Sequence, residues 1–307
     1  MSFYEHVFWD IAGACNSKCR YCCNGANSLS GGMHRSMAGF LPREEFEDAL
    51  VFLTERGAIA PNKTRIELYN WGEPFLHPHF ETMLRTVSKM GFSFGLSTNA
   101  SILKTIPVDT ISKLAEVRFS MPGFSQNSYD RMHGFNFNVI CDTIRAITAS
   151  IRTVSPDTNI GIAFHLYKFN LSEIVEAKEF CKQIGIHFFP LYAYPNGFSM
   201  AKSFFAGEIP RRSAKNIENE LLVDKLDIIR QKRPDDYVCP QSSILVLDEF
   251  CNVLQCCGTD RAVLGHILGK LQEVDFDYLQ RLRKNAAVCS LCAKLKLDYM
   301  WHNACAN

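Results

Sequence analysis

The chain has 307 residues, a net charge of +1 at pH 7 and 47% hydrophobic residues, which is typical of a globular enzyme with one large domain and a smaller one. The near-neutral charge argues against a nucleic-acid ligand, because phosphate binding needs a basic face. We expect no membrane association and a cytoplasmic location, because the sequence shows neither a membrane-length apolar run nor a signal-peptide pattern.

Strands and helices alternate along the first two thirds of the chain. We expect strands at 6–13, 64–69, 92–97, 117–121, 159–165 and 186–192, and helices at 42–56, 79–90, 138–154 and 171–184. This α/β alternation predicts parallel βαβ units. Periodicity alone does not separate an incomplete barrel from an open doubly wound sheet. In both architectures, ligands bind beyond the C-terminal ends of the strands.

Thirteen cysteines without a secretion signal point to a reducing compartment and to metal ligation rather than to disulfides. Four lie at 15–23, directly after the first predicted strand, and seven lie between Cys239 and Cys305. The remaining two, Cys141 and Cys181, fall in apolar helical patterns, and we expect them to be small buried residues.

The first group contains Cys15, Cys19 and Cys22 in the spacing C-x3-C-x2-C, and Tyr21 precedes the third cysteine. A [4Fe–4S] cluster usually takes four thiolates, so three on one loop would leave one iron open to another ligand. Half of a zinc site is the alternative, although Cys23 is badly placed to supply a further ligand.

This spacing resembles that of radical S-adenosylmethionine (SAM) enzymes, in which the open iron chelates the methionine part of SAM. The resemblance implies a partial (β/α)6 TIM-like barrel over residues 1–200. It also implies cleavage of SAM to a 5′-deoxyadenosyl radical that removes a hydrogen atom from a substrate. Tyr21 would cover the adenine or shield the cluster.

Motifs after later strands resemble the family's SAM contacts. Trp71-Gly72-Glu73-Pro74 resembles the Gly-Gly-Glu-Pro motif. Gly72 would let the backbone approach SAM, and Glu73 would accept a hydrogen bond from its ammonium. Further candidates lie in or after the third, fourth and fifth strands: Ser97, Thr98, Asn99, Ser120, Gly161, Ile162 and Ala163. The first three would make polar contacts to SAM, the serine of the fourth strand would reach the ribose, and the last three would pack beside the adenine. Taken singly, each has a helix cap or strand packing as its alternative.

The last third of the chain carries the second cysteine group. Glycines and prolines predict a loop at 193–212, and a charged helix at 213–232 follows. We therefore expect a loop and linker helix at 201–236 and a small domain at 237–307, with a β-hairpin whose arms are 244–247 and 253–255.

These cysteines resemble the SPASM and twitch extensions of radical SAM enzymes, which bind an auxiliary cluster. The short twitch form fits better, because Asp298 stands where the longer form has a cysteine. The resemblance implies a second [4Fe–4S] cluster with four ligands: Cys239, Cys256, Cys289 and Cys292. Cys257 is an alternative to Cys256, and a zinc ribbon is an alternative to the cluster.

Three fates are open to a substrate radical in this family. It can lose an electron to the auxiliary cluster, as in aminocyclitol dehydrogenases, or form a new bond, as in peptide-modifying members. It can also take a hydrogen atom from a thiol, as in aminoglycoside epimerases. The first strand begins within ten residues of Met1, which leaves no room ahead of it for a leader-binding domain. We therefore expect a small substrate, such as a sugar, aminoglycoside or cyclitol.

Cys251 stands where the twitch motif has glycine, and its spare thiol favours epimerisation with Cys251 as the hydrogen donor. The alternatives are a neutral substitution at a turn that does not require a positive φ, or a further cluster ligand. We expect a flavodoxin or ferredoxin as electron donor, contacted by Lys18, Arg20 and Arg35, unless these are ordinary solvated side chains. A non-enzymatic iron–sulfur or zinc protein is the alternative from another class, and the SAM-contact motifs argue against it.

Overall fold

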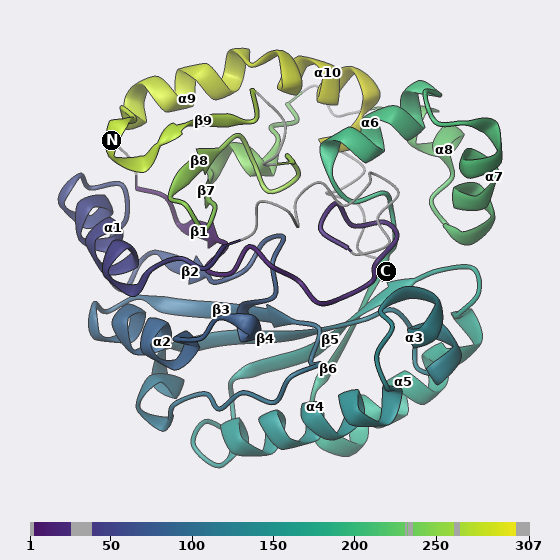
Figure 1. Ribbon diagram of the computed structural model, residues 1–307, viewed down its shortest axis with the longest axis horizontal. Coiled ribbons are helices and arrows are strands. Elements are labelled where there is room, and N and C mark those ends of the chain that lie inside the picture. Colours follow the sequence, from purple (N-terminus) through teal and green to yellow (C-terminus); the bar gives the residue numbers. More distant parts are fainter. Residues whose placement is uncertain (1–2, 26–38, 231, 233–235, 261–264, 299–307) are drawn as a thin grey trace.

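The computed structural model describes residues 3–25, 39–230, 232, 236–260 and 265–298. One open sheet of nine strands forms its centre, in the order β6-β5-β4-β3-β2-β1-β7-β8-β9 (Figure 1). The first six strands are β1 (His6–Trp9), β2 (Arg65–Glu67), β3 (Ser93–Thr98), β4 (Leu114–Met121), β5 (Asn159–Leu166) and β6 (His187–Tyr192). Each pairs with its neighbour in parallel, which confirms the predicted α/β fold class.

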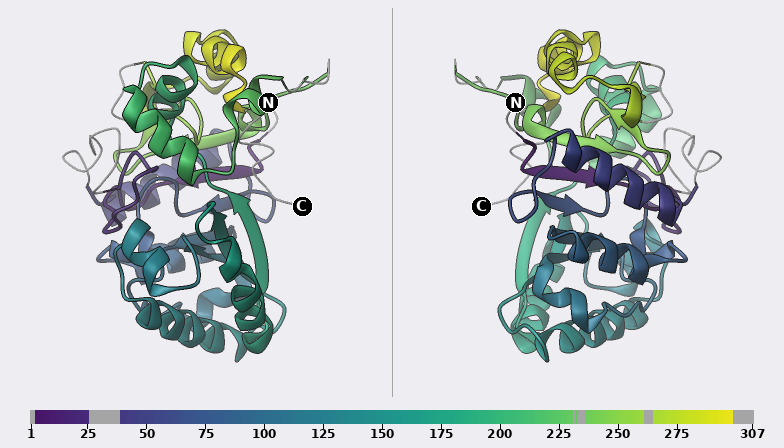
Figure 2. Two further views of the ribbon diagram at one scale, coloured as in Figure 1. Left: turned by 90° about the vertical axis from the view of Figure 1, so that its right-hand side faces the viewer. Right: turned by 90° about the vertical axis from the view of Figure 1, so that its left-hand side faces the viewer.

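Helices cover the outside of this curved row of strands. They are α1 (Arg43–Glu55), α2 (Phe80–Lys89), α3 (Gln126–Met132), α4 (Phe137–Arg152) and α5 (Ile174–Ile184). In α4, the side chains of Ile140, Ile144, Ile147 and Ile151 repeat at helical spacing and are almost fully buried. Burying each such side chain stabilises the fold by about 1.5–3 kcal/mol. Figure 2 shows α4 (teal) and the C-terminal helices (yellow) at opposite ends of the molecule.

Charged side chains that pair with one another fill the barrel at the N-terminal end of its strands. Arg65 forms ion pairs with Glu67 at 2.6 Å and with Glu116 at 2.8 Å, and Arg118 forms one with Glu116 at 2.7 Å. A Cβ atom at Gly95 would lie 1.9 Å from Glu67, so the strand passes close beside this network. The network occupies one end of the barrel, which leaves the C-terminal strand ends for a ligand site.

The C-terminal strands extend the same sheet. Strand β7 (Ile244–Leu247) pairs with β1 in parallel, and β8 (Asn252–Leu254) and β9 (Ile267–Lys270) follow in antiparallel order. The predicted hairpin is therefore confirmed as β7 and β8, and β9 is an addition that the sequence did not reveal. Helices α9 (Phe276–Asn285) and α10 (Ala287–Leu295) follow. The boundaries placed at 200 and 237 stay predictions.

The predicted loop at 193–212 is wrong in its centre, because α6 (Phe198–Ala206) forms there. Its apolar side chains are buried, and Gly197 and Gly207, both with positive φ, bound the helix rather than breaking it. The predicted helix at 213–232 is divided into α7 (Arg211–Glu220) and α8 (Lys225–Arg230). The division lies at Leu221, whose extended backbone forms a β-bridge with Tyr167.

In the described part of the chain, no helix has both the length and the apolar character that a membrane crossing requires.

Candidate functional site

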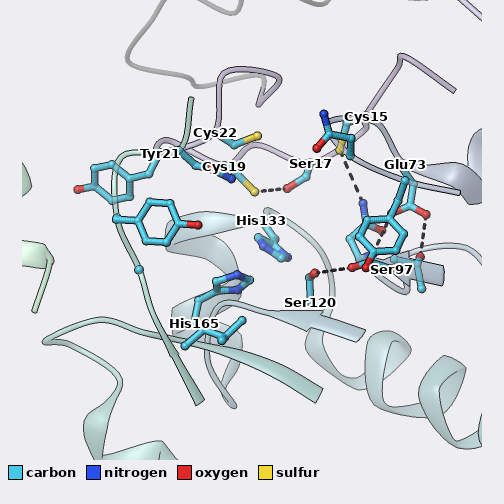
Figure 3. A pocket seen from close by; sticks show the side chains of 18 of the residues that line it. Cys15, Ser17, Cys19, Tyr21, Cys22, Glu73, Ser97, Ser120, His133 and His165 are labelled. Carbon is cyan, nitrogen blue, oxygen red and sulfur yellow. Dashed lines mark hydrogen bonds between the residues drawn. The ribbon is translucent and has the colours of Figure 1, made fainter. Parts of the chain in front are cut away.

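A cavity of about 300 Å³ opens at the C-terminal ends of the strands (Figure 3). The cysteine loop, the loop after β2 and the ends of β3 to β6 line it. Among its lining residues are Cys15, Ser17, Cys19, Tyr21, Cys22, Tyr69, Asn70, Gly72, Glu73, Ser97, Thr98, Asn99, Ser120, His133, His165, Tyr167, Tyr192, Tyr194 and Asn196. Glu73 is the one carboxylate among the described lining residues, and no lysine or arginine is among them.

The three predicted cluster cysteines all reach this cavity. The Ser17 hydroxyl lies 2.8 Å from the Cys19 sulfur, and the Asn99 amide donates to the Cys15 sulfur at 3.9 Å. A Cβ atom at Gly25 would lie 1.9 Å from the carbonyl oxygen of Cys19, so the loop closes on itself where only glycine fits. The sequence therefore folds the three thiols onto one wall.

The chemistry of these thiols fits a metal cluster. Burial raises the pKa of Cys15 well above its usual value and that of Cys19 to about 12. A hydrogen bond from the Cys23 thiol lowers the pKa of Cys22. Bound metal would therefore displace protons from buried thiols. As the side chains of the described residues stand, no three ligand groups are close enough to hold a metal ion, so the assignment rests on the shared cavity wall.

The loop after β2 is tied to the cysteine loop. The Asp10 carboxylate accepts the backbone N–H groups of residues 70–72 at 2.9 Å each. A Cβ atom at Gly72 would lie 1.6 Å from the carbonyl oxygen of Ala12, so the two loops pack backbone to backbone. The close approach predicted for Gly72 is thus made to this chain's own loop.

Glu73 is held rigidly in the cavity wall. One carboxylate oxygen accepts from the Thr98 hydroxyl at 2.7 Å, and the other accepts from the Asn99 backbone N–H at 2.8 Å. The side chain is buried, and burial raises its pKa to about 7. A cationic ligand group next to this carboxylate would favour its ionised form. The arrangement is suited to binding an ammonium.

Tyr21 lies on the opposite side of the cavity, as Figure 3 shows. Its ring stacks on Tyr167 with centroids 6.1 Å apart, and its hydroxyl donates to Glu220 at the end of α7. Arg20 and Arg131 bond to the same carboxylate at 3.1 and 2.8 Å. Glu220 therefore fixes the loop that carries the third cysteine.

Four of the predicted SAM contacts do not line the cavity. Trp71 turns away, and its indole N–H donates to the carbonyl oxygen of Thr259 at 3.1 Å. A Cβ atom at Gly161 would lie 2.4 Å from the ring of Phe189, so this glycine serves strand packing. Ile162 and Ala163 are buried within β5. The structure thus places these four residues in packing roles.

Two histidines that the sequence did not single out lie in the cavity beneath the cysteine loop (Figure 3). His165 lies near the C-terminal end of β5. Its position in a parallel strand was therefore enough to make it a candidate site residue. His133 follows α3, a helix that was not predicted. Burial lowers the pKa of His133 to about 3 and also lowers that of His165, so both rings are neutral at pH 7.

A second cavity, of about 690 Å³, lies among the C-terminal elements. All four predicted auxiliary ligands line it: Cys239, Cys256, Cys289 and Cys292. The Gln255 amide donates to the Cys289 sulfur at 3.0 Å. Cys257 is not among the lining residues, and its backbone N–H donates to Gln241. The donor set fits a four-thiolate cluster, with Cys256 rather than Cys257 facing the cavity.

Cys251 lies in neither cavity. It is fully buried at the β7–β8 turn, and burial, followed by the nearby Glu45 of α1, raises the pKa of its thiol. Its φ of 55° explains why the motif favours glycine at this position. This placement gives no support to Cys251 as a hydrogen donor to a substrate in the main cavity.

Of the residues expected to meet an electron carrier, Lys18 is exposed. Arg20 is held by Glu220, so its charge is already paired within the chain. Arg35 lies outside the described residues, as does Cys305, to which no ligand role was assigned.

Part of the chain is similar in sequence to a curated protein. A Pyrococcus furiosus protein described as tungsten-containing aldehyde ferredoxin oxidoreductase cofactor-modifying protein is 29% identical over 124 residues, which are 40% of this chain and 31% of that protein. The chain thus spans less than a third of this curated relative.

Two crystal structures share the fold at low identity. Streptococcus suis SuiB bound to the precursor peptide SuiA has a TM-score of 0.59 at 14% identity, over 94% of this chain and 66% of that one. BtrN in complex with AdoMet and 2-DOIA has a TM-score of 0.51 at 13% identity, over 100% of this chain and 95% of that one. The family model described as Radical SAM superfamily matches residues 9–181, more than half of the chain. This protein therefore belongs to the radical SAM superfamily.

Proposed function

We propose that this radical SAM enzyme carries two [4Fe–4S] clusters and oxidises a small, hydroxyl-bearing substrate of the sugar or cyclitol type. The observation that carries the proposal is the separation of the cysteines. Three thiols line the main cavity, four line the second, and Cys251 lines neither.

The first site would hold a cluster through Cys15, Cys19 and Cys22, and SAM beside it. When bound, these groups supply a 5′-deoxyadenosyl radical that removes a hydrogen atom from the substrate. Glu73 would accept the ammonium of SAM, since its carboxylate is already oriented by Thr98 and Asn99. The Ser97 and Ser120 hydroxyls, 3.4 Å apart, would contact the ribose, and Tyr21 the adenine.

The second site would hold the auxiliary cluster through Cys239, Cys256, Cys289 and Cys292. When bound, that cluster supplies an acceptor for one electron. Gln255 orients one ligand through its hydrogen bond to the Cys289 sulfur, and such bonds tune both geometry and potential.

The substrate class follows from the remaining cavity wall. Its tyrosines, histidines and Asn196 offer aromatic faces and neutral hydrogen-bonding groups. A polycationic aminoglycoside would need carboxylates, and among the described lining residues Glu73 alone supplies one, which we assign to SAM. We therefore favour a neutral polyol, whose C–H faces pack on aromatic rings and whose hydroxyls bond to imidazole and amide groups.

We favour oxidation, although the sequence position of Cys251 favoured epimerisation. Epimerisation by the predicted route needs a thiol that returns a hydrogen atom within the cavity, and every thiol that lines the described cavity is a proposed cluster ligand. Oxidation of a carbinol removes one hydrogen atom, one proton and one electron. His165, whose ring is neutral at pH 7, would accept this proton and pass it to solvent, and His133, with its pKa of about 3, would only hydrogen-bond the substrate hydroxyl.

The test is turnover of a panel of neutral cyclitols and glycosides by the anaerobically reconstituted protein, with SAM and reductant in deuterated water. We expect a product two mass units lighter than the substrate and no deuterium on carbon. An isomer one mass unit heavier than the substrate, with one carbon-bound deuterium, would establish epimerisation instead. A colourless zinc protein that leaves SAM intact would overturn the enzyme assignment.

A cytoplasmic flavodoxin or ferredoxin is the proposed electron donor. The exposed Lys18 on the cysteine loop supports an acidic carrier docking there. Lys18→Glu should slow turnover with flavodoxin but not with dithionite, and equal effects on both would contradict this docking site.

A further inference from the structure

Residues 258–260, directly after the Cys256–Cys257 pair, form a bridge toward the first site. The carbonyl oxygen of Gly258 accepts the Phe198 N–H at 2.8 Å, and that of Thr259 accepts the Trp71 indole N–H at 3.1 Å. The Asp260 carboxylate accepts the Ser199 N–H at 2.6 Å. This short segment therefore contacts both the loop after β2 and the first turn of α6.

The cysteine loop contacts the chain directly before α6. The Asn196 N–H donates to the carbonyl oxygen of Tyr21 at 2.7 Å, and Asn196 forms a β-bridge with Cys22. The next thiol, Cys23, lies within hydrogen-bond reach of the Asp260 carboxylate. Cys23 and Asp260 are 1% and 2% exposed, so their contact is fully enclosed.

Gly197 shows how tightly these parts fit. A Cβ atom there would lie 2.4 Å from a carboxylate oxygen of Asp260 and 3.2 Å from the Cβ atom of Cys23. Its φ of 109° also disfavours any other residue. The cysteine loop, the start of α6 and residues 258–260 thus meet without free space between them.

We propose that Asp260 is a positioning residue that couples the two cysteine centres. It holds Cys23 and the start of α6 together, and so keeps the neighbouring ligand Cys22 in a position set by the segment that follows Cys256. The buried Asp260 carboxylate accepts from the Ser199 N–H, and displacing the start of α6 would remove this donor. The proposal rests on the proposed function in that both cysteine groups bind clusters.

The test compares Asp260→Asn and Cys23→Ala with wild type in the reconstituted holoenzyme. We expect wild-type iron content in both variants. In each, the EPR signal of the SAM-binding cluster and its change on SAM addition should be altered. Asp260→Asn should also shift that cluster's potential in the positive direction, since a nearby negative charge is removed. Asp142→Asn, at an exposed site on α4, is the matched control and should leave all readouts unchanged.

A double-mutant cycle separates a coupled contact from two independent effects. If the two side chains act through their contact, the double variant should change the EPR signal no more than Asp260→Asn alone. Gly197→Ala, which intrudes on the same contact, should give the same direction of change. Wild-type EPR signals and potential in Asp260→Asn, or additive effects in the double variant, would overturn the proposal.

Hydrogen exchange gives a readout that does not need the clusters. Peptides that cover residues 13–25 should exchange faster in Asp260→Asn than in wild type, with or without iron. Unchanged exchange would overturn the coupling. Failure of the proposed function would instead appear as wild-type protein that binds no iron–sulfur cluster, so the two failures are distinguishable.

Discussion

Replacing Glu73 by glutamine tests the SAM site, because it keeps the shape of the side chain and removes its charge. Thr98 and Asn99 hold the carboxylate in place, so an ammonium would meet an oriented anion. A hydrogen bond to a charged group contributes about 1.5–3 kcal/mol, and its loss should weaken SAM binding by roughly ten- to a hundredfold. Equilibrium dialysis of the cluster-loaded protein under anaerobic conditions measures this.

The pH dependence sharpens the experiment. Burial raises the pKa of Glu73 to about 7, so the ionised form that binds an ammonium is gained as pH rises through 7. Wild-type affinity should therefore be about tenfold lower at pH 6 than at pH 8. In Glu73→Gln this dependence should disappear, apart from the titration of SAM itself, which both proteins share. Equal affinities of the two proteins at pH 8 would refute the assignment of Glu73.

The same shift has a consequence for stability without SAM. A carboxyl whose folded pKa is raised contributes stability below its unfolded pKa of 4.5, and this contribution is lost as pH rises through 7. The free energy of unfolding of the wild type should therefore lose up to about 3 kcal/mol from this group between pH 4 and pH 8, and this part of the pH dependence should be absent in Glu73→Gln. Chemical denaturation of the two SAM-free proteins at both pH values measures this.

Two further substitutions address the remaining cysteines. Cys251→Ala should keep both clusters, SAM cleavage and product formation, because the Cys251 thiol lies outside both cavities. Loss of product with intact SAM cleavage would instead support Cys251 as the hydrogen donor. Replacing Cys289 and Cys292 together by alanine should remove about half of the iron and stop substrate oxidation while 5′-deoxyadenosine still forms; unchanged iron would exclude them as ligands.

The sequence predicted the parts of the molecule that depend on local patterns. Strand and helix alternation gave the parallel order of β1 to β6, and cysteine spacing indicated which thiols share a wall. Seven predicted SAM contacts line the main cavity: Tyr21, Gly72, Glu73, Ser97, Thr98, Asn99 and Ser120. Their positions follow from strand polarity, which brings the ends of parallel strands together.

The remaining features depend on contacts between distant segments. Trp71 lies in the motif that resembles the SAM-binding Gly-Gly-Glu-Pro sequence. Its indole N–H nevertheless donates to the carbonyl oxygen of Thr259, 188 residues further along the chain. In the sequence, Cys251 is a spare thiol and therefore a candidate hydrogen donor. In the structure, its positive φ and its position next to Glu45 of α1 place it in a buried turn. Glycine and proline residues around α6 are expected both for a loop and for a short helix with a glycine at each end. The burial of the phenylalanine side chains of α6 decides between the two.

The central claim is that Cys15, Cys19 and Cys22 form the site of SAM cleavage. The most direct measurement is 5′-deoxyadenosine formation, with iron content, in wild type and in the variant with all three cysteines replaced by alanine. We expect the wild type to cleave SAM under dithionite, and the variant to keep about half of the iron and to form no 5′-deoxyadenosine. A triple variant that still cleaves SAM would contradict the account.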